Sequence, residues 1–294
     1  MAQTVLKSDE SAAPIETVIV PMPRRDRLWR WVRSPRPVRM LLGFAAFFIL
    51  WYLFIDVLKL PRFKELPRFH VALGEWLSRD PVYGTSLFTP TYYEHISASA
   101  LRVFLAFMAS TALGVPIGIL MGWKRLFFGL TFPILEMLRP IPILAWIPLA
   151  IILMPGRELP IIFLTFLSAF FVAILNTLLG VRSIDSVYFR AAQCLGFSER
   201  AILVHIIIPG ALPYIFTGLQ IGMGACWFSL VAAEIVSGQS GLGYAVWQTY
   251  FYVQFPTMVI MMTTLGFCGY VSSMLVRMVG GRLMHWRSRQ IGSL

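Results

Sequence analysis

The sequence predicts an all-α protein embedded in a membrane, with six transmembrane helices. Of its 294 residues, 57% are hydrophobic and 13% are charged, and the mean hydropathy is +0.72. Soluble domains carry about 25% charged residues, so this composition indicates a lipid environment. Six apolar runs approach or exceed the roughly 20 residues that a helix needs to cross a bilayer. The net charge of +11 comes from short basic segments between these runs, which is typical of orientation signals and not of a nucleic-acid-binding patch.

The chain begins with segments that differ in charge. The first 23 residues carry acidic residues and prolines before any basic run, which is the wrong order for a cleaved export signal. Trp29 and Trp31 then stand among arginines, which favours a segment on the inner membrane face, although a simple positively charged flank explains the pattern equally well. The predicted segments are a disordered cytoplasmic tail (1–23), a basic membrane-surface segment (24–39), a first transmembrane helix (40–58), a periplasmic loop (59–95), a five-helix core (96–280) and a basic cytoplasmic tail (281–294).

Charge also predicts the orientation of the spans. Arginines before the first run and after the last place both termini in the cytoplasm, and six crossings satisfy that arrangement. The 182–205 loop is then inside, and the 237–255 loop, which has no Lys or Arg, is outside. The 127–154 run contains four prolines and is expected to be kinked or broken. The five core spans are predicted at 96–122, 127–154, 158–181, 206–236 and 256–280.

One cytoplasmic loop is unusually polar for this chain, FRAAQCLGFSERAILVHIIIPGALP at residues 189–213. Its pattern predicts a short helix over residues 189–195, ended by Gly196 in the left-handed conformation, and a second helix capped by Ser198. Ala191 and Ala192 leave one side of the first helix bare, so another protein can approach its backbone closely. The loop therefore indicates docking rather than catalysis.

These residues resemble the hallmark loop of the inner-membrane permease subunits of ATP-binding-cassette importers, which reads Glu-Ala-Ala, three residues, Gly, and later a closing proline. Ala191, Ala192 and Gly196 match that pattern, Pro209 stands at the closing proline, and Arg190 replaces the family's Glu. Three longer segments are similar to the nitrate, sulfonate and taurine branch of this family: SALRVFLAFMASTALGVPIGILMG (99–122), LRPIPILAWIPL (138–149) and AAEIVSGQSGLGYAVW (232–247).

The resemblance implies a type I importer permease core in a bacterial inner membrane. It implies a small anionic or zwitterionic solute, such as nitrate, a sulfonate or taurine, delivered by a periplasmic binding protein. Two permease copies would pair, with a homodimer the simpler expectation, and each would dock one ATPase subunit that binds ATP and Mg. This chain would hold no cofactor and would not itself be an enzyme. The expected coupling residues are Arg190, Ala191, Ala192, Gly196, Ser198, Glu199 and Pro209.

Two charges in the third predicted span are candidates for the solute pathway. Glu136 and Arg139 lie three residues apart, directly before Pro140 and Pro142. Charged groups at membrane depth cost roughly 2.5–3.5 kcal/mol on insertion scales, so they need a reason to be there. Either Arg139 faces the pathway and favours an anion, or the two side chains neutralise each other within the packed helices. Trp146 follows as a candidate gate residue, with simple packing as the alternative.

Glu234 precedes SGQSGLG, a stretch that cannot continue a regular helix. It either holds the fold of this outer loop or contacts the solute. His205 has no acid or serine at a spacing that suggests catalysis and is expected to be a polar cap. Cys194, Cys226 and Cys268 lack the spacing of a metal site or a disulfide framework.

Two other classes of protein remain as alternatives. An ion-coupled secondary transporter would use midplane carboxylates and would usually show two repeated halves, but no segment recurs in this chain. An intramembrane enzyme would need a polar cluster near one membrane face, but the four histidines are scattered along the chain. The chain has no phosphate-binding Gly-x-x-x-x-Gly-Lys-Ser/Thr loop, so its energy is expected to come from another subunit or from an ion gradient.

Overall fold

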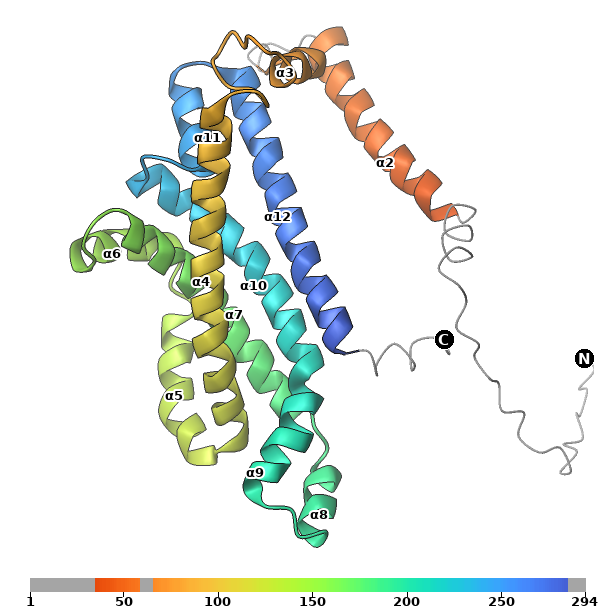
Figure 1. The fold of residues 1–294 in the computed structure, drawn as a ribbon, viewed down its shortest axis with the longest axis vertical. Coiled ribbons are helices and arrows are strands. Elements are labelled where there is room, and N and C mark those ends of the chain that lie inside the picture. The colour runs from red at the N-terminus through yellow and green to blue at the C-terminus, as the bar shows by residue number, and fades with distance from the viewer. Residues whose placement is uncertain (1–34, 59–65, 285–294) are drawn as a thin grey trace, which may run out of the picture. The chain divides into compact units, whose positions relative to one another are not determined.

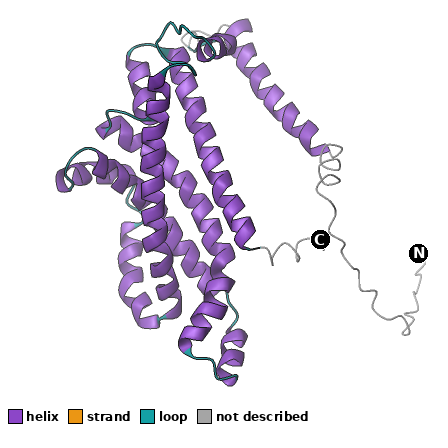
Figure 2. Cartoon of the chain, in the orientation of Figure 1, coloured by secondary structure: helices purple, strands orange, loops and turns teal. Residues whose placement is uncertain are grey.

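The computed structural model describes residues 35–58 and 66–284, and these residues form helices and no strand (Figure 1, Figure 2). The described residues fall into two compact units, the first ending at Trp51 and the second beginning at Tyr52. In the first unit the structure describes α2 (Pro35–Tyr52), whose large apolar side chains, such as Leu41 and Phe44, are exposed as lipid contact requires. The predicted N-terminal tail, most of the basic segment and most of the C-terminal tail lie outside the described residues.

Two short helices of the second unit lie in segments that the sequence predicts as outer loops. After a π-helical turn, η1 (Leu53–Val57), the chain forms α3 (Phe69–Trp76) within the 59–95 segment. Arg68 at the start of α3 forms an ion pair with Asp56, with 2.9 Å between Nε and Oδ1. The 237–255 segment contains α11 (Leu242–Phe251). Both helices are too short to cross a bilayer.

Three long helices, α4 (Pro90–Trp123), α7 (Glu158–Arg182) and α10 (Ile208–Ser237), form the core of the second unit. The central helix is α7, which packs against both of the others. Glycines set these close contacts: a Cβ at Gly118 of α4 would lie 2.6 Å from the Thr177 Cβ, and a Cβ at Gly218 of α10 would lie 2.5 Å from the Asn176 Cβ. Small residues of this kind let helix backbones approach each other in membranes.

The predicted 127–154 span is broken, as its prolines indicate. It consists of α5 (Arg125–Leu138), a short 3-10 turn, η3 (Ile143–Trp146), and α6 (Ile147–Leu153), and the two halves are bent by 93°. The bend falls at residues 139–142, where Pro140 and Pro142 interrupt helical hydrogen bonding. On its inner side α5 packs through Phe128, Phe132 and Leu135 against a cluster around Ile174 of α7.

A helical loop connects α7 to α10. It contains α8 (Ser186–Cys194), α9 (Glu199–Ile202) and a π-helical turn, η4 (Leu203–Ile207), that leads into α10. Within the second unit, α8 and α9 lie at one end and α11 at the other, with α10 running between them (Figure 1). The final helix, α12 (Phe255–Leu283), packs against α3, α10 and α11.

Four described helices are long and apolar enough to cross a membrane, and the bent α5–α6 pair makes five if it counts as one span. The four are α4, α7, the α9–α10 run and α12. The apolar part of α2 with η1 (Leu41–Val57) is shorter than these spans. The protein is therefore an all-helical, multi-pass membrane protein, and a sixth crossing by the first helix stays a prediction.

Candidate functional site

A buried ion cluster joins the three core helices at the end of the unit that carries α11. The Arg102 Nη1 of α4 donates to Glu234 Oε1 of α10 at 2.7 Å, and its Nε and Nη2 donate to the two carboxylate oxygens of Glu158 at 2.6 and 2.7 Å. The Arg102 side chain is 4% exposed and the Glu234 side chain 0%, whereas Glu158, at the start of α7, is 62% exposed. Pairing of this quality offsets the cost of removing the two buried charges from solvent.

The same cluster holds the loop between α10 and α11. Arg102 donates to the Ser240 carbonyl oxygen at 2.6 Å and to the Ser240 hydroxyl at 3.0 Å. The Gly243 N–H donates to Glu234 Oε2 at 2.8 Å, and the Ser99 hydroxyl donates to Glu234 Oε1 at 2.8 Å. Because side chains of two helices bind this loop from both sides, its backbone is fixed on the core.

Glycine is required at the centre of this loop. Gly241 has φ +116°, and a Cβ at this position would collide with the Glu234 carboxylate. Its N–H donates to His95 Nδ1 at 3.1 Å, and the next N–H, of Leu242, donates to the Ser99 hydroxyl at 2.8 Å. The SGQSGLG stretch therefore serves to bring backbone N–H groups against α4 and Glu234.

These contacts favour the first interpretation of Glu234, in which it holds the outer loop, because a fully buried carboxylate offers no surface to a solute in this conformation. Sequence reasoning did not single out Ser99, Arg102 or Glu158. For Arg102 a signal was available: it is a charge inside the apolar run 96–122, and the argument applied to Glu136 applies to it as well.

Glu136 and Arg139 do not form an ion pair, so the interpretation in which they neutralise each other within one chain is wrong for this structure. Among the described residues, neither side chain has a hydrogen-bond or ion-pair partner. Both are exposed on one flank of α5, where they border a crevice of about 10 Å³ beside Phe171 and Leu175 of α7. A crevice of this size is too small for a solute.

The residues after the bend differ in their environments. Pro140 is exposed, and Pro142 precedes the η3 turn. Trp146 packs against the main hydrophobic core, and its Nε1 is buried without a hydrogen-bond partner. Packing is thus the observed role of the Trp146 ring, and its role as a gate stays a prediction.

At the other end of the unit, hydrogen bonds fix the conformation of the α8–α9 loop. The Asp185 carboxylate caps α8 by accepting from the Val187 N–H at 2.9 Å. The C-terminus of α8 is a Schellman motif: Gly196 has φ +76°, its N–H donates to the Gln193 carbonyl at 3.0 Å, and the Phe197 N–H donates to the Ala192 carbonyl at 3.0 Å. The predicted left-handed Gly196 is confirmed.

The predicted second helix of this loop is also present. The Ser198 hydroxyl accepts from the Ala201 N–H at 3.3 Å and caps α9. The Glu199 carboxylate accepts from Lys124 Nζ, in the turn between α4 and α5, at 2.7 Å. Pro209 lies in the first turn of α10, and His205 donates through Nδ1 to the Ala201 carbonyl at 3.0 Å.

The two faces of α8 differ in burial. On one face Ala192 is 4% exposed and Phe189 packs against the main hydrophobic core. Arg190 is exposed, and its guanidinium reaches the Ser186 hydroxyl, one turn earlier, at 3.4 Å. The other face, which we call the α8 apolar face, is formed by exposed residues of α8 and its C-cap that share one side of the helix: Val187, Tyr188, Ala191, Cys194 and Leu195.

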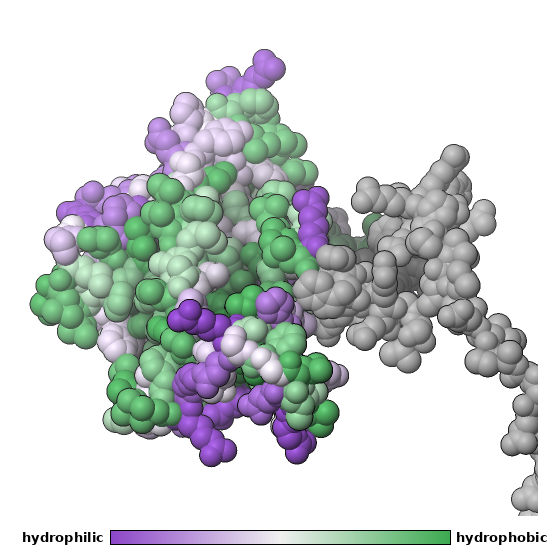
Figure 3. Space-filling model, turned by 60° about the horizontal axis from the view of Figure 1, so that its bottom comes forward, coloured by the Kyte–Doolittle hydropathy of each residue, from purple (hydrophilic) through white to green (hydrophobic). Residues whose placement is uncertain are grey.

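The end of the unit that carries α8 shows hydrophilic and hydrophobic residues side by side (Figure 3). Tyr188 is 63% exposed and Leu195 is 76% exposed, although both lie in a polar loop outside the apolar spans. Exposed apolar groups that are gathered on one face and surrounded by polar residues are typical of a protein-binding surface. The sequence carries this signal in the helical spacing of the five residues.

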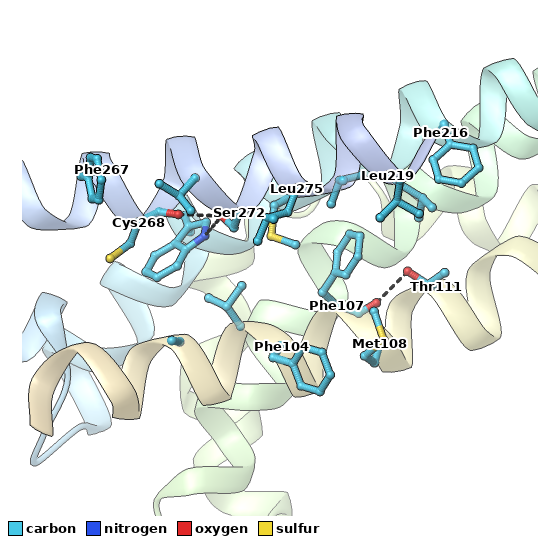
Figure 4. A pocket seen from close by; sticks show the side chains of 17 residues that line it. Phe104, Phe107, Met108, Thr111, Phe216, Leu219, Phe267, Cys268, Ser272 and Leu275 are labelled. Carbon is cyan, nitrogen blue, oxygen red and sulfur yellow. Dashed lines mark hydrogen bonds between the residues drawn. The ribbon is translucent and has the colours of Figure 1, made fainter. Parts of the chain in front are cut away.

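A second apolar surface is a groove of about 750 Å³ that α4, α10 and α12 line (Figure 4). Its polar groups are already bonded within the protein. The Thr111 hydroxyl donates to the Phe107 carbonyl at 2.8 Å, and the Ser272 hydroxyl accepts from Trp227 Nε1 at 2.8 Å. The other polar side chain of the groove, the Cys268 thiol, is only a weak donor, so the groove does not suit an anionic solute. Within residues 35–58 and 66–284, no three His, Cys, Asp or Glu residues are grouped to hold a metal ion.

Residues 114–285 match a family of known proteins, the binding-protein-dependent transport system inner membrane components. The chain belongs to this family. Its members are transport permeases, and the long apolar helices of the second unit are consistent with that class.

Relatives of known name cover most of the chain. It is 38% identical to the taurine transport system permease protein TauC of Escherichia coli (strain K12) over 218 residues, which cover 74% of this chain and 78% of TauC. It is 35% identical to the bicarbonate transport system permease protein CmpB of Synechococcus elongatus over 217 residues, which cover 71% of this chain and 76% of CmpB. It is 37% identical to the nitrate import permease protein NrtB of a Synechocystis strain over 155 residues, 53% of this chain and 56% of NrtB.

Solved structures share the fold. The inward-facing MetNI methionine ABC transporter matches with a TM-score of 0.57 at 17% identity, over 66% of this chain and 94% of the matched chain. A bacterial ABC transporter that imports the acidic polysaccharide alginate matches with a TM-score of 0.55 at 14% identity, over 88% of this chain and 99% of the matched chain. At these identities the likeness concerns the fold alone.

Proposed function

We propose that this chain is the membrane subunit of an importer that moves a small anionic or zwitterionic solute, driven by ATP hydrolysis in a partner subunit. The relatives named for taurine, nitrate and bicarbonate all concern small charged solutes. ATP and Mg are bound by the partner, since this chain carries no phosphate-binding loop. A periplasmic binding protein delivers the solute.

The observation that carries the proposal is the α8 apolar face. It consists of exposed apolar residues on a helix whose ends are both fixed, by the Asp185 cap and by the Schellman motif at Gly196. A rigid helix with an apolar face fits a groove of a partner protein. The partner is the ATPase subunit, and α8 with α9 is the lever through which its closure moves the core.

Other residues of the α8–α9 loop connect it to the rest of the second unit. Ala192 and Phe189 join α8 to the core, and Glu199 ties α9 to Lys124 near the end of α4. A displacement of α8 is therefore transmitted to α4 and α10 together. Arg190, where relatives of this class have Glu, is exposed beside the apolar face and contributes a positive charge to the contact.

Both termini and the α8–α9 loop lie in the cytoplasm, and the α10–α11 loop lies in the periplasm, where the binding protein docks. The loop held by Glu234 and Arg102 presents a fixed backbone to that protein. The solute crosses between two copies of this chain, along the side of α5 and the bend at Pro140 and Pro142, with Trp146 near the bend.

The test is co-purification with an ATP-binding-cassette ATPase subunit from the same organism. Tyr188→Asp places a charge on the α8 apolar face, and Gln193→Asp places the same charge on an exposed polar position of the same helix. We expect Tyr188→Asp to abolish co-purification and ATP-dependent uptake in proteoliposomes, and Gln193→Asp to retain both. Equal retention by the two variants would remove the docking role.

A further inference from the structure

We propose that Glu136 and Arg139 pair between two copies of this chain: Glu136 of each copy binds Arg139 of the other across a two-fold interface formed by the charged flank of α5. The inference rests on the proposed function, because it requires the permease to act as a pair. Beyond the proposed function, it identifies the surface through which the two copies contact each other and the residues that form ion pairs across it.

The first argument is the depth of the two charges. The α5 helix starts at Arg125, beside Lys124 and the α8–α9 loop. At 1.5 Å per residue, Glu136 lies about 17 Å and Arg139 about 21 Å along the helix from that start, well inside a hydrocarbon layer about 30 Å thick. Charges at such depth face protein or water and not lipid.

The second argument is that one copy provides no partner for either charge. Within the described part of the chain neither side chain forms an ion pair or a hydrogen bond. Both side chains are exposed, so a second copy can reach them. The crevice that they border measures about 10 Å³, which is roughly the room that one water molecule needs by the same measure. The flank is therefore not a solute pocket within one subunit.

The third argument is self-complementarity. A two-fold axis brings the same patch of each copy together, so a patch with one acidic and one basic residue meets its own complement. Glu136 and Arg139 differ by about 4.5 Å in height along the helix, a gap that the long arginine side chain can span in both directions at once. Beyond Arg125 at its start, α5 exposes large apolar residues that suit lipid or the partner copy: Leu126, Leu130, Ile134 and Met137.

The experiment uses opposite charge changes in two differently tagged copies expressed together. Glu136→Arg makes the flank all basic, and Arg139→Glu makes it all acidic. Each variant alone repels itself, and we expect the yield of tag-to-tag dimer in detergent to fall by about tenfold or more. A mixture of the two restores both cross-copy pairs, and the dimer yield returns to within about twofold of the native chain.

The mixture separates the possible arrangements. If the two residues paired within one helix, each variant would carry a like-charge pair in its own copy and mixing would restore nothing, which would overturn the proposal. If both faced lipid or water, no variant would change the dimer yield, with the same consequence. The readout needs neither ATPase nor transport, so its outcome is independent of the α8 test.

Cross-linking gives a second measurement in case a charge variant fails to fold. In a background of Cys194→Ser, Cys226→Ala and Cys268→Ala, one copy carries Glu136→Cys and the other Arg139→Cys. Oxidation is expected to yield a disulfide-linked dimer. Phe267→Cys, on the exposed side of α12, is the matched control and is expected to give none. A dimer from the control alone would contradict the proposed interface.

Discussion

Replacement of Arg102 by Leu tests the buried ion cluster of α4, α7 and α10. Arg102 donates five hydrogen bonds, two to Glu158, one to Glu234 and two to Ser240. Without it, the fully buried Glu234 carboxylate keeps only the Ser99 hydroxyl and the Gly243 N–H. Removing one member of a buried ion pair costs about 3–5 kcal/mol, because the other charge is left uncompensated.

Glu158→Gln is the matched control, because the Glu158 side chain is 62% exposed. Arg102 is buried, but water screens the exposed Glu158 carboxylate and Arg102 keeps its ion pair with Glu234, so we discount the contribution of this half-exposed pair to about 1 kcal/mol. For chains of 150–250 residues, 1 kcal/mol shifts the melting temperature by about 2–4 °C. We therefore expect a drop of about 6–20 °C for Arg102→Leu and at most about 4 °C for Glu158→Gln.

The assay is the apparent melting temperature of the detergent-solubilised protein, taken from the loss of the monodisperse peak in fluorescence-detected gel filtration. A third variant, Arg102→Leu with Glu234→Gln, also removes the unpaired Glu234 charge and should recover part of the lost melting temperature. If Glu158→Gln lowered the melting temperature as much as Arg102→Leu did, or if the double variant were the least stable of all, burial would not be the reason that the cluster matters.

Three further predictions concern other parts of the second unit. Gly196→Pro inserts normally but loses solute-stimulated ATPase activity in reconstituted complexes, because proline cannot adopt φ +76° and removes the N–H that closes α8; full stimulation would refute this. Gly118→Ala lowers stability by about 1–3 kcal/mol in the same melting assay, because the added Cβ would lie 2.6 Å from the Thr177 Cβ. Gly129→Ala is the control and is neutral or stabilising, because no atom lies within 4 Å of its added Cβ. Similar losses in both variants would contradict the packing argument. Lys124→Gln changes stability by less than about 1 kcal/mol, since both partners of its ion pair with Glu199 are exposed. A larger loss would contradict the small contribution expected for an exposed pair.

Local features of this chain could be predicted because they depend on neighbouring residues. The bend between α5 and α6 follows from Pro140 and Pro142, and the end of α8 follows from Gly196, whose conformation few other residues adopt. The helices α4, α7, α10 and α12 were also predictable, because each corresponds to one continuous apolar run of the sequence. The short α11 was not predicted, because its ten residues, although mostly apolar, are too few to meet the length criterion for a transmembrane span.

Contacts between distant residues could not be read from one sequence. Arg102 and Glu234 are 132 residues apart, and no local pattern around either residue indicates that the two form an ion pair. The absence of a Glu136–Arg139 pair also depends on tertiary structure, because spacing by three allows a contact within a helix but does not enforce it. The α8 apolar face is a different case: its helical spacing is visible in the sequence, but only the burial of Ala192 and Phe189 shows which face remains exposed.

The central claim, that α8 is the surface on which an ATPase subunit docks from the cytoplasm, can be tested with a residue that the chain already has. Cys194 is exposed on the α8 apolar face, whereas Cys226 is buried and can be replaced by Ala together with Cys268. A membrane-impermeant maleimide should label Cys194 in inside-out vesicles and not in right-side-out vesicles, and bound ATPase subunit should protect it. Labelling from the periplasmic side, or a labelling rate that the ATPase leaves unchanged, would contradict the claim.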